Sequence, residues 1–394
     1  MKTYAVALFA ILLAGIAGLF LASPDPASFL VFKMPPAPPG PNGKTIAEEL
    51  GFARDAKLLV VNSDDSCGHP AFTEGVIEVL SAGIVKSTSV IVHDRNDADL
   101  RRLAVLAKDD PEWGIGIHLT LTNEYQQGYP WKPVLSDKQV PSLYNAKGLA
   151  WEKISEVEAF VDPAHAALEF EAQIAKALRL GIQLTHIDSH MGTAYRNSRF
   201  PGAAADGLRM AAIRAAEKFD LPLTMNTFDE ASAQSMEYMD QHQLIRPDTL
   251  FGFYELAELN SHLSYEGPAI QRWITAFVIK QVFGFELPYR NYDSVGEDQE
   301  VRGEIDRQAI LNIVKPGLNH FYMHAAVAES VSGDRIPNGM NHPSGVDEIV
   351  RLSDSAVWSS DEMAQFLEDQ GIELINYSQI RKIQQARRAQ RPGR

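Results

Sequence analysis

The chain has 394 residues, of which 45% are hydrophobic and 22% charged, a composition that is typical of globular proteins and excludes disordered, collagen-like and multi-span membrane proteins. Its single cysteine excludes an internal disulfide framework and a cysteine-rich zinc site. Lys and Arg number 36 against 51 Asp and Glu, and the net charge of −15 argues against nucleic acid as a partner.

The N-terminal segment is the most hydrophobic stretch of the chain. Residues 5–22 carry no charged or polar side chain, and a membrane-spanning helix needs about 20 apolar residues. We interpret residues 1–22 as a signal-anchor or signal peptide, with a buried core helix as the alternative. Residues 23–45 then form a proline-rich linker. This interpretation predicts an extracytoplasmic protein, periplasmic or at the cell surface, that is membrane-anchored or secreted through its N-terminal segment.

From residue 57 onward, short apolar runs alternate with amphipathic segments, which predict strands and helices respectively. The predicted strands cover residues 57–62, 87–93, 114–121, 183–189, 222–227, 319–323 and 372–376. The predicted helices cover residues 71–82, 97–108, 163–180, 204–219, 269–283, 301–314 and 361–370. Such alternation indicates parallel βα units, either in a closed or distorted barrel or in an open doubly wound sheet. Residues 122–160 and 228–268 lack a clear period, so we expect long loops there, near the active site.

Polar residues stand at the ends of several predicted strands, where α/β proteins build their sites. Asp64 and Asp65 follow the first strand, where one carboxylate can bind a cation and the other can act as a base. A turn that caps the next helix is the alternative for this pair. In the third strand, period-two alternation places His118 on a face with glycines and Thr120. This suits a ring that faces a site, although a core histidine is the alternative.

Two further groups contain pairs of histidines. His186, Asp188 and His190 share one strand face, and His190 lies furthest toward the strand end, so it is the best metal ligand. Asp188 could accept a hydrogen bond that orients an imidazole. His320 and His324 are spaced in the same way near a later strand end, and His324 is a candidate general acid.

Together these residues provide one carboxylate and two imidazoles for a divalent ion, with a carboxylate and a histidine to spare. That set is the minimum for metal-assisted hydrolysis, in which a base takes the proton of water and an acid protonates the leaving group. We expect Zn²⁺ or Mg²⁺ first, while Mn²⁺, Co²⁺ and Ni²⁺ also suit these ligands. Cys67 is expected to pack rather than to act as a nucleophile, because nearby carboxylates disfavour its thiolate.

Three of these segments resemble the YdjC-like, or ChbG-type, carbohydrate deacetylases, which are relatives of the polysaccharide deacetylases. The segments are residues 62–92, 113–122 and 185–190, and they occur in the order of the family. The resemblance covers about residues 57–377 and implies a distorted (β/α) barrel of the glycoside hydrolase/deacetylase type. We expect residues 46–380 to form this barrel as a single domain with long loop insertions.

The resemblance also implies an activity, the removal of N-acetyl groups from acetylated amino sugars or oligosaccharides with metal-bound water as the nucleophile. It implies Asp64 as the general base and His324 as a catalytic or substrate-binding histidine. The metal ligands implied are Asp65, His118 and His190. A metal-dependent amidase or esterase on a non-sugar substrate and a non-catalytic tethered glycan-binding protein remain the alternatives.

The chain departs from the family pattern at two places. Met191, Gly192 and Thr193 follow His190 where the family continues with further histidines, and the arginine often seen on the next strand is missing from residues 221–228. Large aromatic residues could stack on sugar rings or cover an edge of the core. These are Trp113, Trp131 and Trp151.

The C-terminal residues 381–394 form a basic tail with no acidic side chain. Such a tail could contact an anionic lipid or polymer, but a solvated and fraying helix end is the expectation we favour.

Overall fold

The computed structural model describes residues 32–33, 38–40, 42–195, 207–225, 231–252, 299–337 and 346–390. Within these residues the chain forms one eight-stranded sheet in the order β1-β6-β7-β2-β3-β4-β5, with β8 paired to β2. Every strand pair is parallel except β1 with β6. The strands are β1 (Phe32–Lys33), β2 (Lys57–Ser66), β3 (Ser87–Ile91), β4 (Gly114–Leu119), β5 (Leu184–Ser189), β6 (Thr249–Gly252), β7 (Gly317–Met323) and β8 (Ile372–Leu374).

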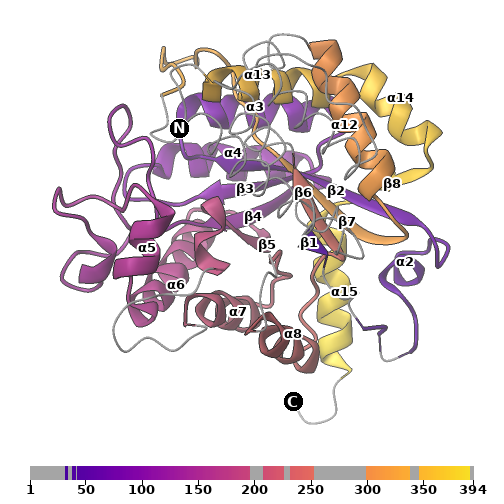
Figure 1. The fold of residues 1–394 in the computed structure, drawn as a ribbon, viewed down its shortest axis with the longest axis horizontal. Coiled ribbons are helices and arrows are strands. Elements are labelled where there is room, and N and C mark those ends of the chain that lie inside the picture. The colour runs from indigo at the N-terminus through magenta and orange to yellow at the C-terminus, as the bar shows by residue number, and fades with distance from the viewer. Residues whose placement is uncertain are drawn as a thin grey trace, which may run out of the picture.

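Helices surround this sheet, which curves as a half-barrel (Figure 1). They are α2 (Ile46–Glu49), α3 (Pro70–Ala82), α4 (Asp97–Asp109), α5 (Ile154–Phe160), α6 (Pro163–Arg179), α7 (Gly207–Phe219), α8 (Ala231–Gln241), α12 (Gln299–Ile313), α13 (Val346–Trp358), α14 (Asp361–Asp369) and α15 (Tyr377–Ala389). The predicted α/β fold, a distorted barrel with long loops, is confirmed.

Local signals in the sequence explain where several helices begin and end. The Asp162 side chain accepts a hydrogen bond from Ala164 N at 2.9 Å and caps α6, whose first residue is Pro163. Helix α3 ends at Gly83, which adopts the left-handed conformation (φ 92°) that favours glycine. These helices therefore start and stop as the sequence predicts.

The core explains why the first strand is an almost continuous apolar run. Alternate residues of β2 point to opposite faces of the sheet, and both faces are covered. Leu58 and Val60 pack with Ile380 of α15, whereas Leu59 and Val61 belong to a separate cluster with residues of α3 and α12. Strand β2 is buried on both sides, as parallel strands usually are.

Some predicted elements differ from the structure. The strand predicted at 222–227 is only an isolated bridge between Ile187 and Leu223, and the last residues of that range lie outside the described ones. Helix α5 and helix α8 fall within the predicted long loops, and α13 was not predicted. The helix predicted at 269–283 also lies outside the described residues.

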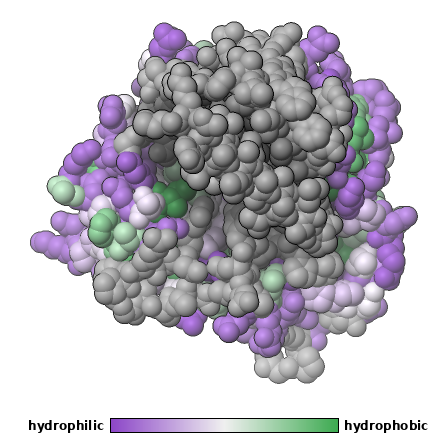
Figure 2. Space-filling model, in the orientation of Figure 1, coloured by the Kyte–Doolittle hydropathy of each residue, from purple (hydrophilic) through white to green (hydrophobic). Residues whose placement is uncertain are grey.

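The predicted extracytoplasmic location is contradicted and needs correction. In the part of the chain that the structure describes, none of the helices is both long and apolar enough to cross a bilayer. Residues 1–31, which include the proposed signal-anchor or signal peptide, lie outside the described residues. The described residues seen in Figure 2 are mostly hydrophilic, in keeping with the net charge of −15.

The start of the basic tail belongs to an ordered helix. Asn376 caps α15 through a reciprocal capping box with Gln379. Near the other end of α15, Arg387 and Arg388 are buried and pair with Glu49 and Asp220, each at 2.7 Å. The expectation of a solvated, fraying helix end is therefore wrong, because ion pairs and packing hold these arginines against the body. Residues 391–394 lie outside the described part.

Candidate active site

Asp65, His118 and His190 meet at the carboxyl ends of β2, β4 and β5, and we call them the Asp–His cluster. One oxygen of Asp65, Oδ1, lies 3.3 Å from His118 Nε2 and 2.9 Å from His190 Nδ1. All three side chains are buried, and their ligand atoms lie within 4.8 Å of one another. Two imidazole nitrogens thus point at one carboxylate oxygen. A carboxylate oxygen and two imidazole nitrogens are a donor set that suits a divalent metal such as Zn²⁺.

The backbone of β2 turns Asp65 into this position. The pairing of β2 with β3 shifts register between Ser63 and Ser66, which indicates a bulge. Within that bulge Asp65 has a φ of 65°, in the left-handed region that few non-glycine residues adopt. In a regular strand the adjacent side chains of Asp64 and Asp65 would point to opposite faces, and the bulge allows both carboxylates to lie beside His118.

Each imidazole of the cluster has a carboxylate at its other nitrogen. His118 Nδ1 lies 2.6 Å from Asp188 Oδ1, and His190 Nε2 lies 3.0 Å from Glu124 Oε2. Carboxylates in this position orient metal-binding histidines and raise their basicity. Asp188 therefore contacts an imidazole as expected, whereas Glu124, in the loop after β4, was not foreseen.

These charges govern the protonation of the cluster. Burial lowers the pKa of His190, but the carboxylates of Glu124 and Asp65 more than offset this and raise it to about 9. Burial likewise opposes the charge on Asp65, but His190 and Arg351 hold its pKa well below the usual range. Both shifts favour a protonated imidazole beside an ionised Asp65, and a divalent cation bound there would replace such a proton.

Arg351 supplies a positive charge that the motifs did not contain. This residue of α13 donates from Nη2 to Asp65 Oδ2 at 2.6 Å and to the Tyr125 hydroxyl at 2.9 Å. Its guanidinium lies 3.9 Å from the centre of the Phe72 ring, a cation–π distance. An arginine therefore reaches the cluster from a helix, although none stands on residues 221–225.

Asp64 lies beside the cluster in a different environment. Asn62 Nδ2 donates to Asp64 Oδ1 at 2.6 Å and to Asp188 Oδ2 at 3.2 Å, so one amide bridges the two carboxylates. Burial and the charge of Asp188 raise the pKa of Asp64 to about 8. The pKa of Asp64 is therefore raised and the pKa of Asp65 is lowered, although the two residues are adjacent. Such a difference is expected of carboxylates with different roles in a reaction.

The histidines predicted from β7 separate into two environments. His324 follows the end of β7, whose last residue, Met323, pairs with Ser63 of β2, the residue before Asp64. Its backbone N–H donates to Asp354 at 2.8 Å, and burial lowers the pKa of its imidazole to about 3. His320 lies deeper, where its Nδ1 is 2.7 Å from the Tyr377 hydroxyl.

Three residues of the motifs have a packing role. The ring of His186 stacks on Tyr377 with 3.9 Å between the ring centres. A Cβ atom at Gly116 would come within 2.4 Å of His186, so this glycine of β4 makes room for that ring. Cys67 is buried, and burial raises the pKa of its thiol, so it remains protonated.

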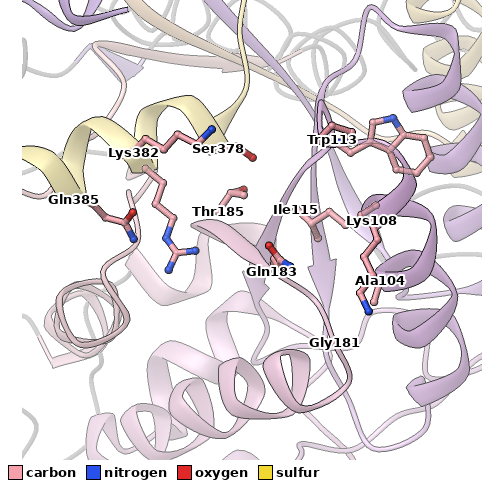
Figure 3. Close-up of a pocket in the computed structure, with 13 residues that line it drawn as sticks. Ala104, Lys108, Trp113, Ile115, Gly181, Gln183, Thr185, Ser378, Lys382 and Gln385 are labelled. Atoms are coloured by element: carbon pink, nitrogen blue, oxygen red, sulfur yellow. The ribbon is translucent and has the colours of Figure 1, made fainter.

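The three tryptophans considered for sugar stacking pack within or against the hydrophobic core. Trp131 is buried and stacks on His93 with 5.0 Å between ring centres, and Trp151 stacks on Phe160 at 4.9 Å. Trp113 precedes β4 at the amino ends of the strands, opposite the cluster (Figure 3). These three side chains therefore cover parts of the core rather than line the cluster.

The fold and the cluster define a distorted (β/α) barrel with a metal-compatible Asp–His site at the carboxyl ends of its strands. The model of the YdjC-like protein family matches residues 58–369, and the chain belongs to this family. The resemblance noted from the motifs is thereby confirmed.

Several relatives carry descriptive names. The chain is 32% identical over 269 residues to a carbohydrate deacetylase of Enterococcus faecalis, which covers 65% of this chain and 95% of the relative. A carbohydrate deacetylase of Brevibacillus brevis is 24% identical over 82% of this chain and 99% of its own length. A chitooligosaccharide deacetylase of Serratia marcescens is 33% identical over 34% of this chain and 50% of its own.

A solved structure supports the fold. The crystal structure of a putative cellobiose-phosphate cleavage protein from Enterococcus faecalis superimposes with a TM-score of 0.55. It is 21% identical and covers 82% of this chain and 99% of its own. At this identity the likeness establishes the shared fold alone.

Proposed function

We propose that this protein is a metal-dependent carbohydrate deacetylase that hydrolyses N-acetyl groups of amino sugars or oligosaccharides. The observation that carries the proposal is the convergence of His118 Nε2 and His190 Nδ1 on Asp65 Oδ1. Relatives named carbohydrate deacetylases and chitooligosaccharide deacetylase support the substrate class. The net charge of −15 also suits a neutral acetylated sugar better than an anionic polymer.

In this proposal Asp65, His118 and His190 hold one divalent ion, with Zn²⁺ or Mg²⁺ as the first candidates. Asp188 and Glu124 keep the imidazoles in the orientation that presents a nitrogen to the ion. A bound ion would polarise the acetyl carbonyl and the attacking water, and its charge would favour the ionised form of Asp64.

Asp64 is proposed as the general base. Asn62 holds Asp64 Oδ1 at 2.6 Å, which fixes the carboxylate. A base with a raised proton affinity takes a proton from water more readily than an ordinary carboxylate does, and the pKa of Asp64 is raised to about 8. Asp64 thus accepts the proton as the new carbon–oxygen bond forms.

His324 is proposed as the group that protonates the leaving amine. Burial lowers the pKa of its imidazole to about 3. The ring is therefore uncharged near neutral pH and would relay a proton rather than supply one. One ring nitrogen would accept the proton that Asp64 has taken from water, while the other donates its proton to the sugar nitrogen as the carbon–nitrogen bond breaks. His324 is then neutral again.

A metal-dependent amidase or esterase for a non-sugar substrate is the second candidate. It is favoured by the positions of the tryptophans, because Trp131 and Trp151 stack on other side chains rather than offering a free ring to a sugar. The two candidates differ in substrate and share the same cluster.

Mass spectrometry of acetylated substrates tests the proposal. Metal-loaded protein is incubated with N-acetylated chito-oligosaccharides, with N-acetylated peptides and with simple acetyl esters, and we expect loss of acetyl from the sugars. The Asp64→Asn variant should be inactive. Activity on peptides or esters alone would favour the second candidate. Wild type that binds the sugars but releases no acetate would contradict both and support a glycan-binding protein.

A further inference from the structure

A separate cavity lies at the end of the sheet opposite the Asp–His cluster. It has a volume of about 400 Å³ and lies between α4 and α15, over the amino ends of β4 and β5 (Figure 3). Its floor includes Thr185, near the start of β5, whereas His190 follows the end of the same strand, roughly 16 Å further along the extended chain. Its volume falls in the range of about 300–1,000 Å³ of small-molecule sites.

Helix α15 turns a regular polar face toward this cavity. Ser378, Arg381, Lys382 and Gln385 all line it, and their spacing of three, four and seven residues places them on one side of the helix. Three of these four residues, Arg381, Lys382 and Gln385, belong to the basic tail of residues 381–394, and Ser378 precedes it.

Helix α4 forms the opposite wall of the cavity. Ala104, Ala107 and Lys108 line the cavity and also share one helix side. The two alanines leave space that longer side chains would fill, while Lys108 adds a cation. Trp113 and Ile115 supply apolar lining.

The charges around the cavity are of one sign. Among the residues that the structure describes, three cationic side chains line it, those of Lys108, Arg381 and Lys382, and none of these lining residues is acidic. This is unusual surface in a chain with a net charge of −15. Within the described residues neither lysine forms an ion pair with a carboxylate.

Arg381 is held in place by hydrogen bonds to backbone carbonyl groups, which carry no negative charge. Its Nη1 donates to the Leu184 carbonyl at 2.6 Å and its Nε to the Asp220 carbonyl at 3.2 Å. Asp220 is the acidic residue whose charge influences the pKa of Arg381. Its carboxylate forms an ion pair with Arg388 at 2.7 Å instead. The guanidinium is thus fixed at the cavity by backbone oxygens.

We propose that this cavity binds a small phosphate monoester, an activity separate from deacetylation. Its phosphate would lie beside Arg381 and Lys382 on α15, with Lys108 on the opposite wall adding to the positive potential, and its organic part would contact Trp113 and Ile115. Three positive charges match a phosphate dianion better than a single carboxylate, and both lysine and arginine bind phosphate through charge-assisted hydrogen bonds.

Isothermal titration calorimetry with phenyl phosphate tests this site, with phenol as the uncharged counterpart and inorganic phosphate as the anion alone. We expect saturable, salt-sensitive binding of phenyl phosphate to the full chain and no binding of phenol. Replacing both exposed lysines (Lys108→Ala with Lys382→Ala) should weaken binding by roughly tenfold or more. Lys138→Ala, an exposed lysine elsewhere, is the matched control and should bind as wild type does.

Three results would overturn the proposal. They are absence of saturable binding of phenyl phosphate to wild type, equal binding of phenol, or unchanged affinity in the double lysine variant. Because Lys108 and Lys382 are exposed, the double variant is expected to fold, and circular dichroism verifies this. The deacetylation assay is independent of each outcome, since the cavity and the cluster lie at opposite ends of the sheet.

Discussion

At the residue scale, the carboxylate behind each imidazole should control how tightly the Asp–His cluster holds an ion. Glu124 Oε2 lies 3.0 Å from His190 Nε2, and Glu124→Gln replaces this charged acceptor with a neutral amide. Loss of such a partner typically weakens metal binding roughly 10- to 100-fold. We predict a loss of that size for Zn²⁺, measured by competition with a chromophoric chelator.

Glu152→Gln is the matched control for this prediction. Glu152 lies in the same loop after β4 and pairs with Lys147 at 3.3 Å, away from the cluster. Its substitution should leave the affinity unchanged. Equal affinities of the Glu124→Gln protein and wild type would show that Glu124 does not position His190.

Single residues also show what could be predicted from the sequence. Asp65, His118 and His190 end parallel strands, and parallel strands end at one edge of a sheet, so their meeting follows from the pattern. Glu124 and Arg351 reach the cluster from a loop and a distant helix, and no local signal marks them. His186 lies on the same strand face as His190, so the sequence pattern does not distinguish it from a metal ligand. The packing of Tyr377 against its ring is what identifies its role in the core.

At the element scale, Glu169 ties the loop after β4 to α6 and should make stability depend on pH. Its carboxylate accepts hydrogen bonds from Val134 N at 2.7 Å and Leu135 N at 3.0 Å. Burial nevertheless raises its pKa to about 7 from an ordinary 4.5. The folded protein therefore binds more protons here than the unfolded chain between about pH 4.5 and pH 7, and this contribution to stability is lost as pH rises through that window.

Urea denaturation at several pH values between 5 and 8 tests this linkage. In Glu169→Gln, which cannot ionise, the free energy of unfolding should fall less steeply with rising pH than in wild type. Glu171→Gln, on the same helix but at an exposed pair with Lys218, should keep the slope of wild type. Identical slopes in all three proteins would contradict the assigned role of Glu169.

Elements differed in how well the sequence predicted them. Helix α6 has an Asp-Pro start and an apolar face, and it was predicted nearly to its ends. For residues 381–394 the sequence predicts a fraying helix end, because charge alone does not show which residues the arginines of α15 contact. Glu49 and Asp220 come from elsewhere in the chain, and their ion pairs with Arg387 and Arg388 exist only in the folded protein.

At the scale of the whole molecule, the two ends of the sheet carry different chemistry. Carboxylates and histidines gather at the carboxyl ends of the strands, and cations line the cavity at the amino ends. The alternation of apolar runs and amphipathic helices predicts parallel βα units, because each unit repeats the same pattern, but it fits a barrel and an open doubly wound sheet equally. The resemblance to the YdjC-like family is what implied the barrel. Which end would bind an anion could not be predicted, since that depends on how α4 and α15 face each other.

The central claim is that one divalent ion in the Asp–His cluster is required for deacetylation. Chelator-treated protein is titrated with Zn²⁺, and acetate release from N-acetylated chito-oligosaccharide is measured at each addition. We expect acetate release to rise from near zero and to saturate at one ion per chain in wild type, and we expect no such rise in His118→Ala. Undiminished acetate release from protein shown to be free of metal would contradict it.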